Sequence, residues 1–316
     1  MKPKKLFLLN KDLNNLIIYI LAFFFLHNGD VLAKSSGTTG ASTLKIVPSA
    51  RAFGMAEAFT GIADDVNTIY FNPAGLSLLD RDGMSLMYKK GIADTGTGVM
   101  NIAFPVKKIG SWGFSVLTYY GGIAEIFSDD GSSKKIEAQR DYLFIGSFAP
   151  RITKEGAVGF NVKVLNSTLA ENYSATAYAV DLGILIKSTK EMESTFGVVL
   201  QNIDITGKGI KYIKYSDPLP LTLRLGWGYR ISSKKNPTTL AIDGVKAKGS
   251  HWEVGIGLES QIGKVVEGRL GYKFGYDFPY ISAGIGIQWG RFDLDIGASL
   301  LGYLGFNCQF STGLQF

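Results

Sequence analysis

The sequence has few of the residues on which most exported enzymes and disulfide-bonded domains depend. Its 316 residues include one cysteine, Cys308, and two histidines, His27 and His251. A single cysteine excludes an intramolecular disulfide. His27 falls in an expected leader. His251 lies at one end of an alternating segment, on its polar face, where a histidine is ordinarily exposed to solvent. Because no Ser–His pair can be argued from the spacing, the sequence does not predict a catalytic triad or any other enzyme site.

Long hydrophobic runs are also scarce, since the chain has only one, near its start. Residues 16–26 (LIIYILAFFFL) follow Lys2, Lys4 and Lys5 and precede Val31-Leu32-Ala33. A basic start, a short apolar run and a small-residue cleavage site are typical of a secretory signal peptide. A retained anchor is the alternative, but a spanning helix needs roughly twenty residues. We therefore expect residues 1–33 to be removed and the mature chain to begin near Lys34.

The remaining apolar residues are dispersed along the chain. Hydrophobic residues make up 46% of the sequence and aromatics 12%, with 39 glycines. Dispersed apolar residues with many glycines and aromatics favour a β-barrel over a helical protein. Loss of a leader with four lysines and two aspartates lowers the formal charge from +6 to about +4, which does not indicate a nucleic-acid partner.

From Met84 onward, apolar and polar residues alternate. In residues 221–231, for example, Leu221, Leu223, Leu225, Trp227, Tyr229 and Ile231 alternate with Thr222, Arg224, Gly226, Gly228 and Arg230. Successive side chains of a strand point to opposite faces, so each such segment has one apolar and one polar face. About fourteen segments show this pattern, at roughly 84–90, 97–107, 110–121, 140–152, 156–166, 175–188, 193–203, 219–232, 238–245, 251–262, 265–275, 279–289, 292–302 and 305–316.

The lengths of these segments and of their links predict a membrane barrel. Tilted strands of nine to eleven residues cross a bilayer, and bacterial barrels have short periplasmic turns and longer external loops. Links after odd-numbered segments tend to be long (89–98, 121–141, 166–176, 201–220), whereas those after even-numbered segments are short. This alternation predicts an outer-membrane location with both termini periplasmic.

A soluble β-sandwich or barrel is the alternative to this interpretation, because period two alone does not distinguish them. A fourteen-stranded barrel with an apolar interior would enclose a large dry void, which close-packed proteins avoid. The last segment alternates and contains Phe310 and the C-terminal Phe316, the usual signal to the barrel assembly machinery. We therefore predict an all-β fold, a transmembrane antiparallel up-and-down β-barrel of about 14 strands at residues 83–316, with outer-membrane lipid around it.

Residues 34–82 lack the alternation and predict a different structure. Ser49 is placed to cap a short helix through Thr60, and Asp64 or Asp65 to cap a turn over residues 66–71. Asn72-Pro73-Ala74-Gly75-Leu76 then predicts a reversal, with Gly75 left-handed. We expect an N-terminal, partly helical plug in the lumen. The glycines 226, 228, 255, 257, 284 and 286 would leave room for its backbone. A flap outside the barrel is the alternative.

A family resemblance follows from the same residues. The run from Leu44 through Ala50-Arg51-Ala52 and Ala63-Asp64-Asp65 to Asn72-Pro73-Ala74-Gly75-Leu76 resembles the N-terminal signature of the PorV/PorQ family. That family is related to the FadL-type long-chain fatty acid transporters. The resemblance implies a fourteen-stranded barrel with an N-terminal hatch. It also implies one of two roles, a plugged channel for small hydrophobic molecules or a non-channel partner of secretion-system proteins in surface assembly.

Two other features were considered as sites. Asp64 and Asp65 form an acidic pair, but adjacent acids before an apolar turn are more often helix caps than metal ligands, so neither a metal nor a cofactor is predicted. The 201–220 link is unusually apolar and is the candidate external mouth for a small hydrophobic ligand. Packing on the barrel rim is an equal alternative for its residues Ile203, Ile205, Ile210, Tyr212, Ile213 and Tyr215.

Overall fold

Alternating sequence segments form the strands of a closed antiparallel barrel. The computed structural model describes residues 37–106, 108–127, 131–150, 152, 156–188, 193–231, 236–275, 280–301 and 305–316; the expected signal peptide lies outside them. The wall strands in these ranges are β1 (Gly83–Lys90), β2 (Gly96–Val106), β3 (Gly110–Tyr120), β6 (Gln139–Pro150), β7 (Gly156–Leu169), β8 (Tyr173–Lys187), β9 (Ser194–Asp204), β12 (Thr222–Ile231), β13 (Thr238–Ala247), β14 (Trp252–Ile262), β15 (Val266–Phe274), β16 (Tyr280–Trp289), β17 (Phe292–Leu301) and β18 (Phe306–Gln315).

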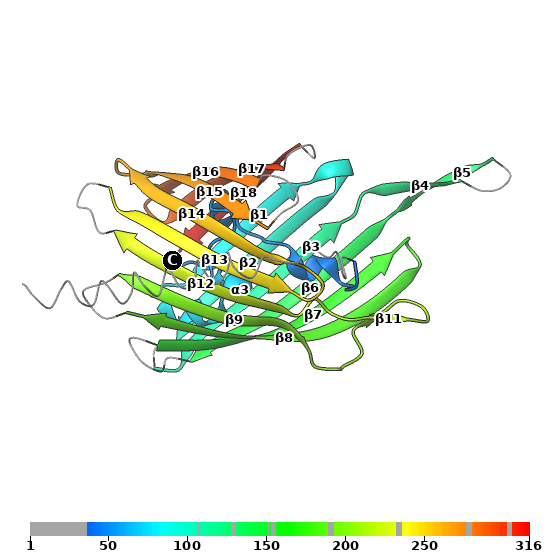
Figure 1. Cartoon of the computed structure of the whole chain (residues 1–316), viewed down its shortest axis with the longest axis horizontal. Helices are drawn as coiled ribbons and strands as arrows, with labels where there is room; N and C mark the ends of the chain where they lie inside the picture. The colour runs from blue at the N-terminus through cyan, green and yellow to red at the C-terminus, as the bar shows by residue number, and fades with distance from the viewer. Residues whose placement is uncertain are drawn as a thin grey trace, which may run out of the picture. The chain divides into compact units, whose positions relative to one another are not determined.

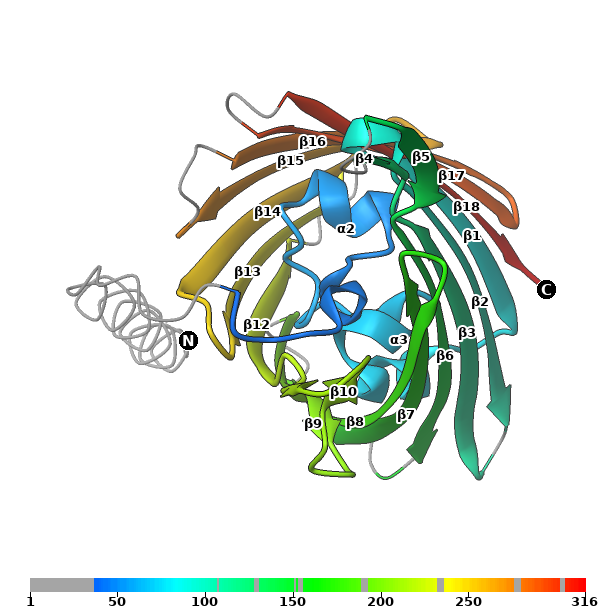
Figure 2. The same cartoon turned by 90° about the vertical axis from the view of Figure 1, so that its right-hand side faces the viewer.

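These fourteen strands pair in chain order and close by pairing β1 with β18 (Figures 1 and 2). Each strand corresponds to one of the fourteen predicted segments, so the predicted fold class is confirmed. Gly83 pairs with Gln315, which places the first and last strand ends together. Below, the end of the barrel where β1 begins is the turn end. The opposite end, with the β3–β6 and β9–β12 links, is the loop end.

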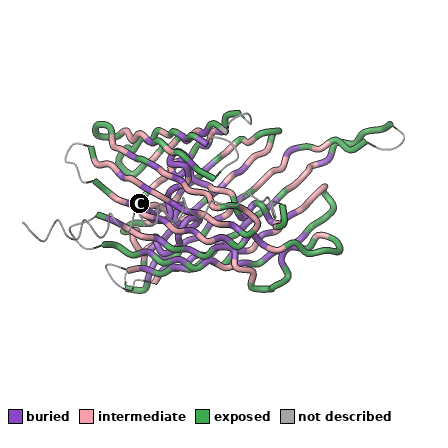
Figure 3. The backbone as a smooth tube through the Cα atoms, in the orientation of Figure 1, coloured by how far each residue is buried: buried purple, intermediate pink, exposed green. Residues whose placement is uncertain are grey.

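The outer face of the barrel is apolar, as the alternation predicts. Along β8, for example, Tyr178, Leu182 and Ile184 are exposed, whereas Asp181 and Leu185, at the intervening positions, are buried (Figure 3). A soluble barrel with its apolar face inward would show the reverse. A continuous exposed apolar surface of this kind is what a lipid-facing barrel presents and what a soluble monomer avoids.

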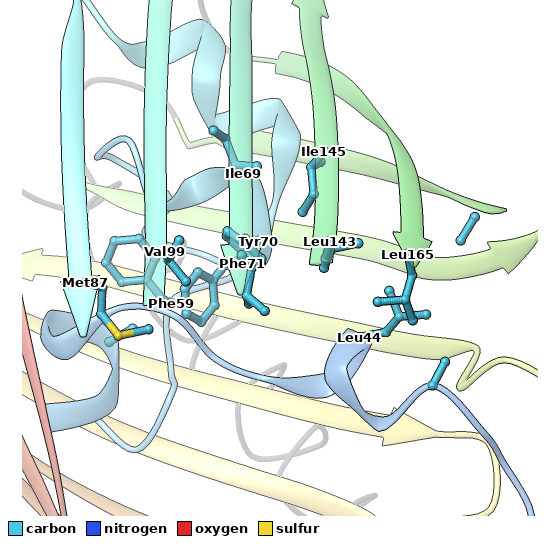
Figure 4. Close-up of a cluster of buried hydrophobic side chains, with 14 of the residues drawn as sticks. Leu44, Phe59, Ile69, Tyr70, Phe71, Met87, Val99, Leu143, Ile145 and Leu165 are labelled. Carbon is cyan, nitrogen blue, oxygen red and sulfur yellow. The ribbon is translucent and has the colours of Figure 1, made fainter. Parts of the chain in front are cut away.

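The lumen is not uniformly polar, which differs from our expectation. The lumen faces of β2, β3, β6 and β7 carry the buried residues Val99, Leu117, Leu143 and Leu165, which belong to one hydrophobic cluster with plug residues (Figure 4). The plug needs a dry surface against which to bury its own apolar side. The predicted polar, glycine-rich lining is therefore interrupted by this apolar cluster on β2–β7.

Two links differ from the prediction. The 166–176 link, expected to be long, shortens to residues 170–172 because β7 continues to Leu169 and β8 begins at Tyr173. Two links contain additional hairpins. β4 (Ile123–Phe127) and β5 (Ser133–Glu137) project from the loop end, and β10 (Ile210–Lys211) pairs with β11 (Ser216–Asp217). A 3-10 helix, η3 (Ile92–Asp94), lies in the β1–β2 link.

Residues 37–82 lie inside the barrel as short helices joined by irregular chain (Figure 2). They form η1 (Ser42–Lys45), α2 (Ala50–Gly54), α3 (Thr68–Phe71) and η2 (Pro73–Leu78). The hydroxyl of Ser49 accepts from the Ala52 amide, as predicted for a helix cap. The helix ends at Gly54 rather than continuing to Thr60, because Ala56 and Glu57 adopt positive φ. Among the described residues, no helix has the length and apolarity needed to cross a membrane.

The plug begins at the loop end and leaves at the turn end. The Gly40 amide donates to the Pro218 carbonyl, 3.0 Å away, in the β9–β12 link. The chain then runs around the lumen wall before it enters β1 at Gly83. The first described residues therefore lie at the end opposite to the last residues of β18, which differs from the prediction that both chain ends share one side. The start of β1 and the end of β18 do share one side.

Candidate ligand site around the plug

A collar of glycines on the lumen face seats the plug. A Cβ atom added at Gly159 or Gly197 would lie closer than 3.0 Å to plug backbone atoms, at Pro73 and Ala74 or at Thr60. Only glycine permits so close a backbone approach. The same holds around the wall at Gly226, Gly255, Gly257, Gly271 and Gly297. Of the six glycines expected in this role, three meet this criterion, whereas Gly228 and Gly284 approach plug backbone only to 3.3 Å and Gly286 faces the side chains of Arg269 and Asp295 instead.

Asn72 ties the predicted turn to the wall. Its Oδ1 accepts from the Ala74 amide, and its Nδ2 donates to the Thr60 and Ile184 carbonyls at 3.2 and 3.0 Å. Asn72 is fully buried, so all three bonds are made out of water. Gly75 lies within helix η2 rather than in the expected left-handed conformation. Glycine is needed there because a Cβ would collide with the Ala63 carbonyl and the Thr68 hydroxyl.

Arg51 is the centre of an ionic network on the turn-end side of the plug. Its guanidinium donates two bonds of 2.7 Å to Glu259 on β14 and one of 2.7 Å to Asp64. Asp65 lies 3.1 Å from the same guanidinium, and Arg230 on β12 pairs with the second oxygen of Asp64 at 3.0 Å. Bidentate arginine–carboxylate pairs are among the strong hydrogen-bonded ion pairs, so this network holds the plug to the wall.

The network continues into the wall through Arg269 on β15. Arg269 binds Glu259 at 2.7 Å, Asp295 at 2.6 Å and, at close range, Glu267. These pairs join lumen charges to one another and to the plug. The sequence analysis did not identify Arg51 as their centre. The sequence feature that could have indicated this role is that Arg51 is a single cation among apolar plug residues and is followed by two adjacent acids, Asp64 and Asp65.

Asp64 and Asp65 therefore act mainly as ion-pair partners. Asp65 Oδ1 also accepts from the Asn67 amide at 2.8 Å, the kind of local capping expected from the sequence, whereas helix α3 has no side-chain cap of its own. Within the described ranges, no three or more His, Cys, Asp or Glu side chains are arranged to hold a metal ion.

The carboxyl of Asp65 should make plug stability depend on pH. Burial, together with the negative charge of Asp64, raises the pKa of Asp65 to about 6, although Arg51 opposes the shift. The pKa of an aspartate carboxyl in an unfolded chain is about 3.9. Protonation of Asp65 therefore favours the seated plug. The stability from this group is complete below about pH 4 and is lost as pH rises through about 6. We expect Asp65→Asn to flatten this part of the pH profile of the thermal midpoint, and Asp94→Asn, exposed at the loop end, to leave it unchanged. Equal profiles for Asp65→Asn and the parent would contradict this assignment.

A second set of charges anchors the loop-end side of the plug. Lys273 on β15 binds Glu57 at 2.5 Å and Glu253 at 3.7 Å. Burial acts to raise the pKa of Glu57, but the Lys273 ammonium holds it below its usual value. Arg224 on β12 donates to the Thr60 hydroxyl at 3.0 Å, and Asp243 on β13 accepts the amides of Phe59 and Thr60. Plug backbone and wall charges are therefore mutually satisfied.

A cavity of about 200 Å³ lies between this side of the plug and the wall, and we call it the arm pocket. One side is mainly apolar, formed by plug residues Leu44, Ile46, Val47, Pro48 and Phe71 with Leu143, Val245 and Ala247 of the wall, and Lys45 lies among them. Lys163, Arg224 and Lys273 also line it, but each is paired with a carboxylate. The lining therefore combines an apolar side with paired charges, and Lys45 is its one cation that makes no ion pair with a described residue.

The wall next to the arm pocket contains a β-bulge that the sequence analysis missed. The β8–β9 register shifts between Val180 and Leu182, and Asn202 adopts a left-handed φ of 59°. Buried Asp181 accepts from the Asn202 amide at 2.8 Å and pairs with Lys163 at 2.7 Å, and Lys163 also donates to Asn202 Oδ1. The sequence feature that could have indicated this bulge is the presence of Asp181 and Asn202 among apolar residues of their strands.

The predicted mouth residues separate into two groups. Ile210 is fully buried, and the Tyr212 hydroxyl donates to Ser167 at 2.8 Å, so these two pack inward. Ile205, Ile213 and Tyr215 are exposed, and Ile203 is half-buried. A cavity of about 480 Å³, the outer cavity, lies at the base of this link and is lined by Asn202, Ile203, Leu219 and Leu221. Because Gln201 lines the arm pocket and Asn202 the outer cavity, the bulge lies between the two.

The remaining sequence-predicted residues lie on the outer surface. Phe310 and Phe316 are exposed, and Cys308 lies between Phe306 and Phe310 on the outward face of β18. His251 is exposed just before β14.

Comparison with known proteins gives structural matches and no sequence matches. No family model matches the chain, and no curated protein matches it. The fold is similar to the Ralstonia pickettii toluene transporter TbuX, with 12% identity, a TM-score of 0.57, and coverage of 84% of this chain and 97% of that chain. A Pseudomonas aeruginosa FadL homologue (12% identity, TM-score 0.56, 85% and 98% covered) and the CymD monoaromatic hydrocarbon channel (10%, 0.56, 86% and 98%) are similarly related. These likenesses show a shared plugged-barrel fold, while the resemblance to the PorV/PorQ family stays a prediction.

Proposed function

We propose that this chain is a plugged outer-membrane channel for small, uncharged hydrophobic molecules. The observation that carries the proposal is a pocket with one mainly apolar side, on the loop-end side of a seated plug, inside a barrel whose outer face is apolar. The structural neighbours include a toluene transporter and a monoaromatic hydrocarbon channel. In this proposal residues 1–33 direct export and are removed, and the turn end faces the periplasm.

The size and lining of the arm pocket support a small ring as the ligand. An apolar cavity of about 150 Å³ holds one benzene molecule, and the arm pocket measures about 200 Å³. Three of its four cations, Lys163, Arg224 and Lys273, are already paired with carboxylates, so an anionic ligand that bound them would have to break buried ion pairs, which is unfavourable. We propose that ligand enters from the outer cavity past the bulge at Asn202, with Ile205, Ile213 and Tyr215 forming an external apolar mouth.

A bulky residue in the arm pocket should abolish this function. Val245 lies on the lumen face of β13 and lines the pocket, so Val245→Trp should fill it. We expect the initial rate of toluene uptake by intact cells to fall at least tenfold, to the level of cells without the protein. Ile242→Trp, on the outward face of the same strand, is the matched control and should retain uptake.

Uptake that is independent of the protein, or equal in the two tryptophan variants, would refute the channel proposal. Heat stability of both purified barrels should be compared with that of the parent, so that loss of uptake is not confused with loss of fold.

A further inference from the structure

The turn-end side of the plug holds a second cavity with a different character from the arm pocket. We call this cavity, of about 510 Å³, the vestibule. Its lining includes seven carboxylates, Asp64, Asp65, Asp80, Glu259, Glu267, Asp293 and Asp295, and four guanidinium groups, Arg51, Arg81, Arg230 and Arg269. The vestibule therefore has three negative charges in excess of its positive ones. In the arm pocket, by contrast, three of the four lining cations are each paired with a carboxylate.

The excess charge is concentrated where the wall supplies no cation. Asp293 on β17 is half-buried and makes no hydrogen bond or ion pair with any residue in the described ranges. Asp295, on the same lumen face, has one partner, Arg269, which it shares with Glu259 and Glu267. A half-buried carboxylate without a partner is unfavourable unless a cation or ordered water satisfies it.

A buried hydroxyl in the same wall also lacks a partner. Ser311 on β18 is 5% exposed, lines the vestibule, and its Oγ makes no hydrogen bond with any described residue. Ser311 pairs with Asp295 in the β17–β18 register, and Asp293 pairs with Gly313 two residues further on. A hydroxyl oxygen and an unpaired carboxylate on adjacent strands form a surface that accepts hydrogen bonds.

We infer that the vestibule binds a small organic cation through an ammonium group, held by Asp293 and the Ser311 hydroxyl beneath the plug. A metal ion fits less well, because no three carboxylates in the described part of the chain converge on one point. An ammonium group carries three donors that diverging acceptors can satisfy. Val66, Leu79, Met84 and Leu314 also line the vestibule and offer apolar contact to an alkyl chain. The site is separate from the arm pocket and does not depend on the proposed transport function.

The inference is tested by calorimetric titration of the purified full-length barrel with 1,6-diaminohexane, with 1,6-hexanediol as its uncharged analogue. We expect the diamine to bind and the diol not to bind, and we expect the affinity to fall as ionic strength rises. Asp293→Asn should weaken diamine binding about fivefold and Ser311→Ala about twofold, on the scale of one partly screened ion pair or hydrogen bond. Asp94→Asn, an exposed carboxylate at the loop end, should change nothing.

Three results would overturn the inference. These are equal binding of the diol, unchanged diamine affinity in both Asp293→Asn and Ser311→Ala, and displacement of the diamine by micromolar calcium, which would make the vestibule a metal site. If a lysine-rich hexapeptide binds and the diamine does not, the ammonium group belongs to a protein partner and not to a free amine. Since neither variant removes an ion pair seen in the structure, both should fold.

Discussion

Arg51→Ala is expected to loosen the plug more than any other single side-chain truncation in the lumen. It removes the paired bonds to Glu259 and the contacts to Asp64 and Asp65, and it leaves these buried carboxylates with fewer cations. Breaking a buried ion pair by removing one partner costs about 3–5 kcal/mol. Arg51 is slightly exposed, so we expect the low end of that range, about 3 kcal/mol, which corresponds to more than 100-fold faster opening.

Hydrogen exchange of peptides from residues 50–78 measures this opening directly, and planar-bilayer conductance gives a second measure. The parent barrel should be closed to ions, and Arg51→Ala should show open bursts. Arg81→Ala provides the matched control, because Arg81 lines the same vestibule but is exposed and makes no ion pair within the described ranges. If exchange in the plug is the same in Arg51→Ala as in the parent, the ionic network does not hold the plug.

Gly159→Val is expected to prevent the plug from seating without harming the strand that carries it. Valine favours strand conformation, but its Cβ would lie closer than 3.0 Å to the backbone of Pro73 and Ala74. Overpacking typically costs about 1–3 kcal/mol, and backbone atoms held by the Asn72 bonds have little freedom to move away. We expect the barrel to assemble and the plug peptides to lose exchange protection and become protease-sensitive.

Gly146→Val isolates this effect. Gly146 lies on neighbouring strand β6, and a Cβ there would meet nothing within 4 Å. Its effect on stability should stay within about 0.5 kcal/mol, as at other unconstrained surface positions. A plug that remains protected in Gly159→Val would show that the glycine collar is not needed for close backbone approach.

The two cavities together indicate how one plug can separate two chemical environments. The arm pocket is smaller, has one mainly apolar side and has three of its four cations in ion pairs, whereas the vestibule is larger and has an excess of negative charge. Arg51 on one side and Glu57 on the other connect the same plug to wall strands β14 and β15. A shift of the plug would therefore disturb both cavities at once, which links the Arg51 and Asp65 predictions to the proposed uptake.

Several features of the fold were predictable because they depend on local periodicity alone. Residues 221–231 alternate strictly, and the structure forms β12 at Thr222–Ile231. The capping role of Ser49 also follows from local chemistry. The expectations that were wrong concern positions where contacts with other segments of the chain decide the local structure. The β7–β8 link shortened because the two strands pair with each other beyond their alternating segments, and Gly75 is required by the Ala63 carbonyl rather than by its own dihedral angle.

The alternation of the sequence by itself determined the strand count, the outward apolar face and the existence of a separate N-terminal segment, because side-chain direction in a strand has a fixed period of two. Only the tertiary structure decided which lumen glycines touch the plug, that Arg51 pairs with Glu259, which lies 208 residues later in the chain, and that part of the lumen packs an apolar cluster against the plug. These features depend on contacts between residues distant in sequence, which only closure of the barrel around the plug brings together.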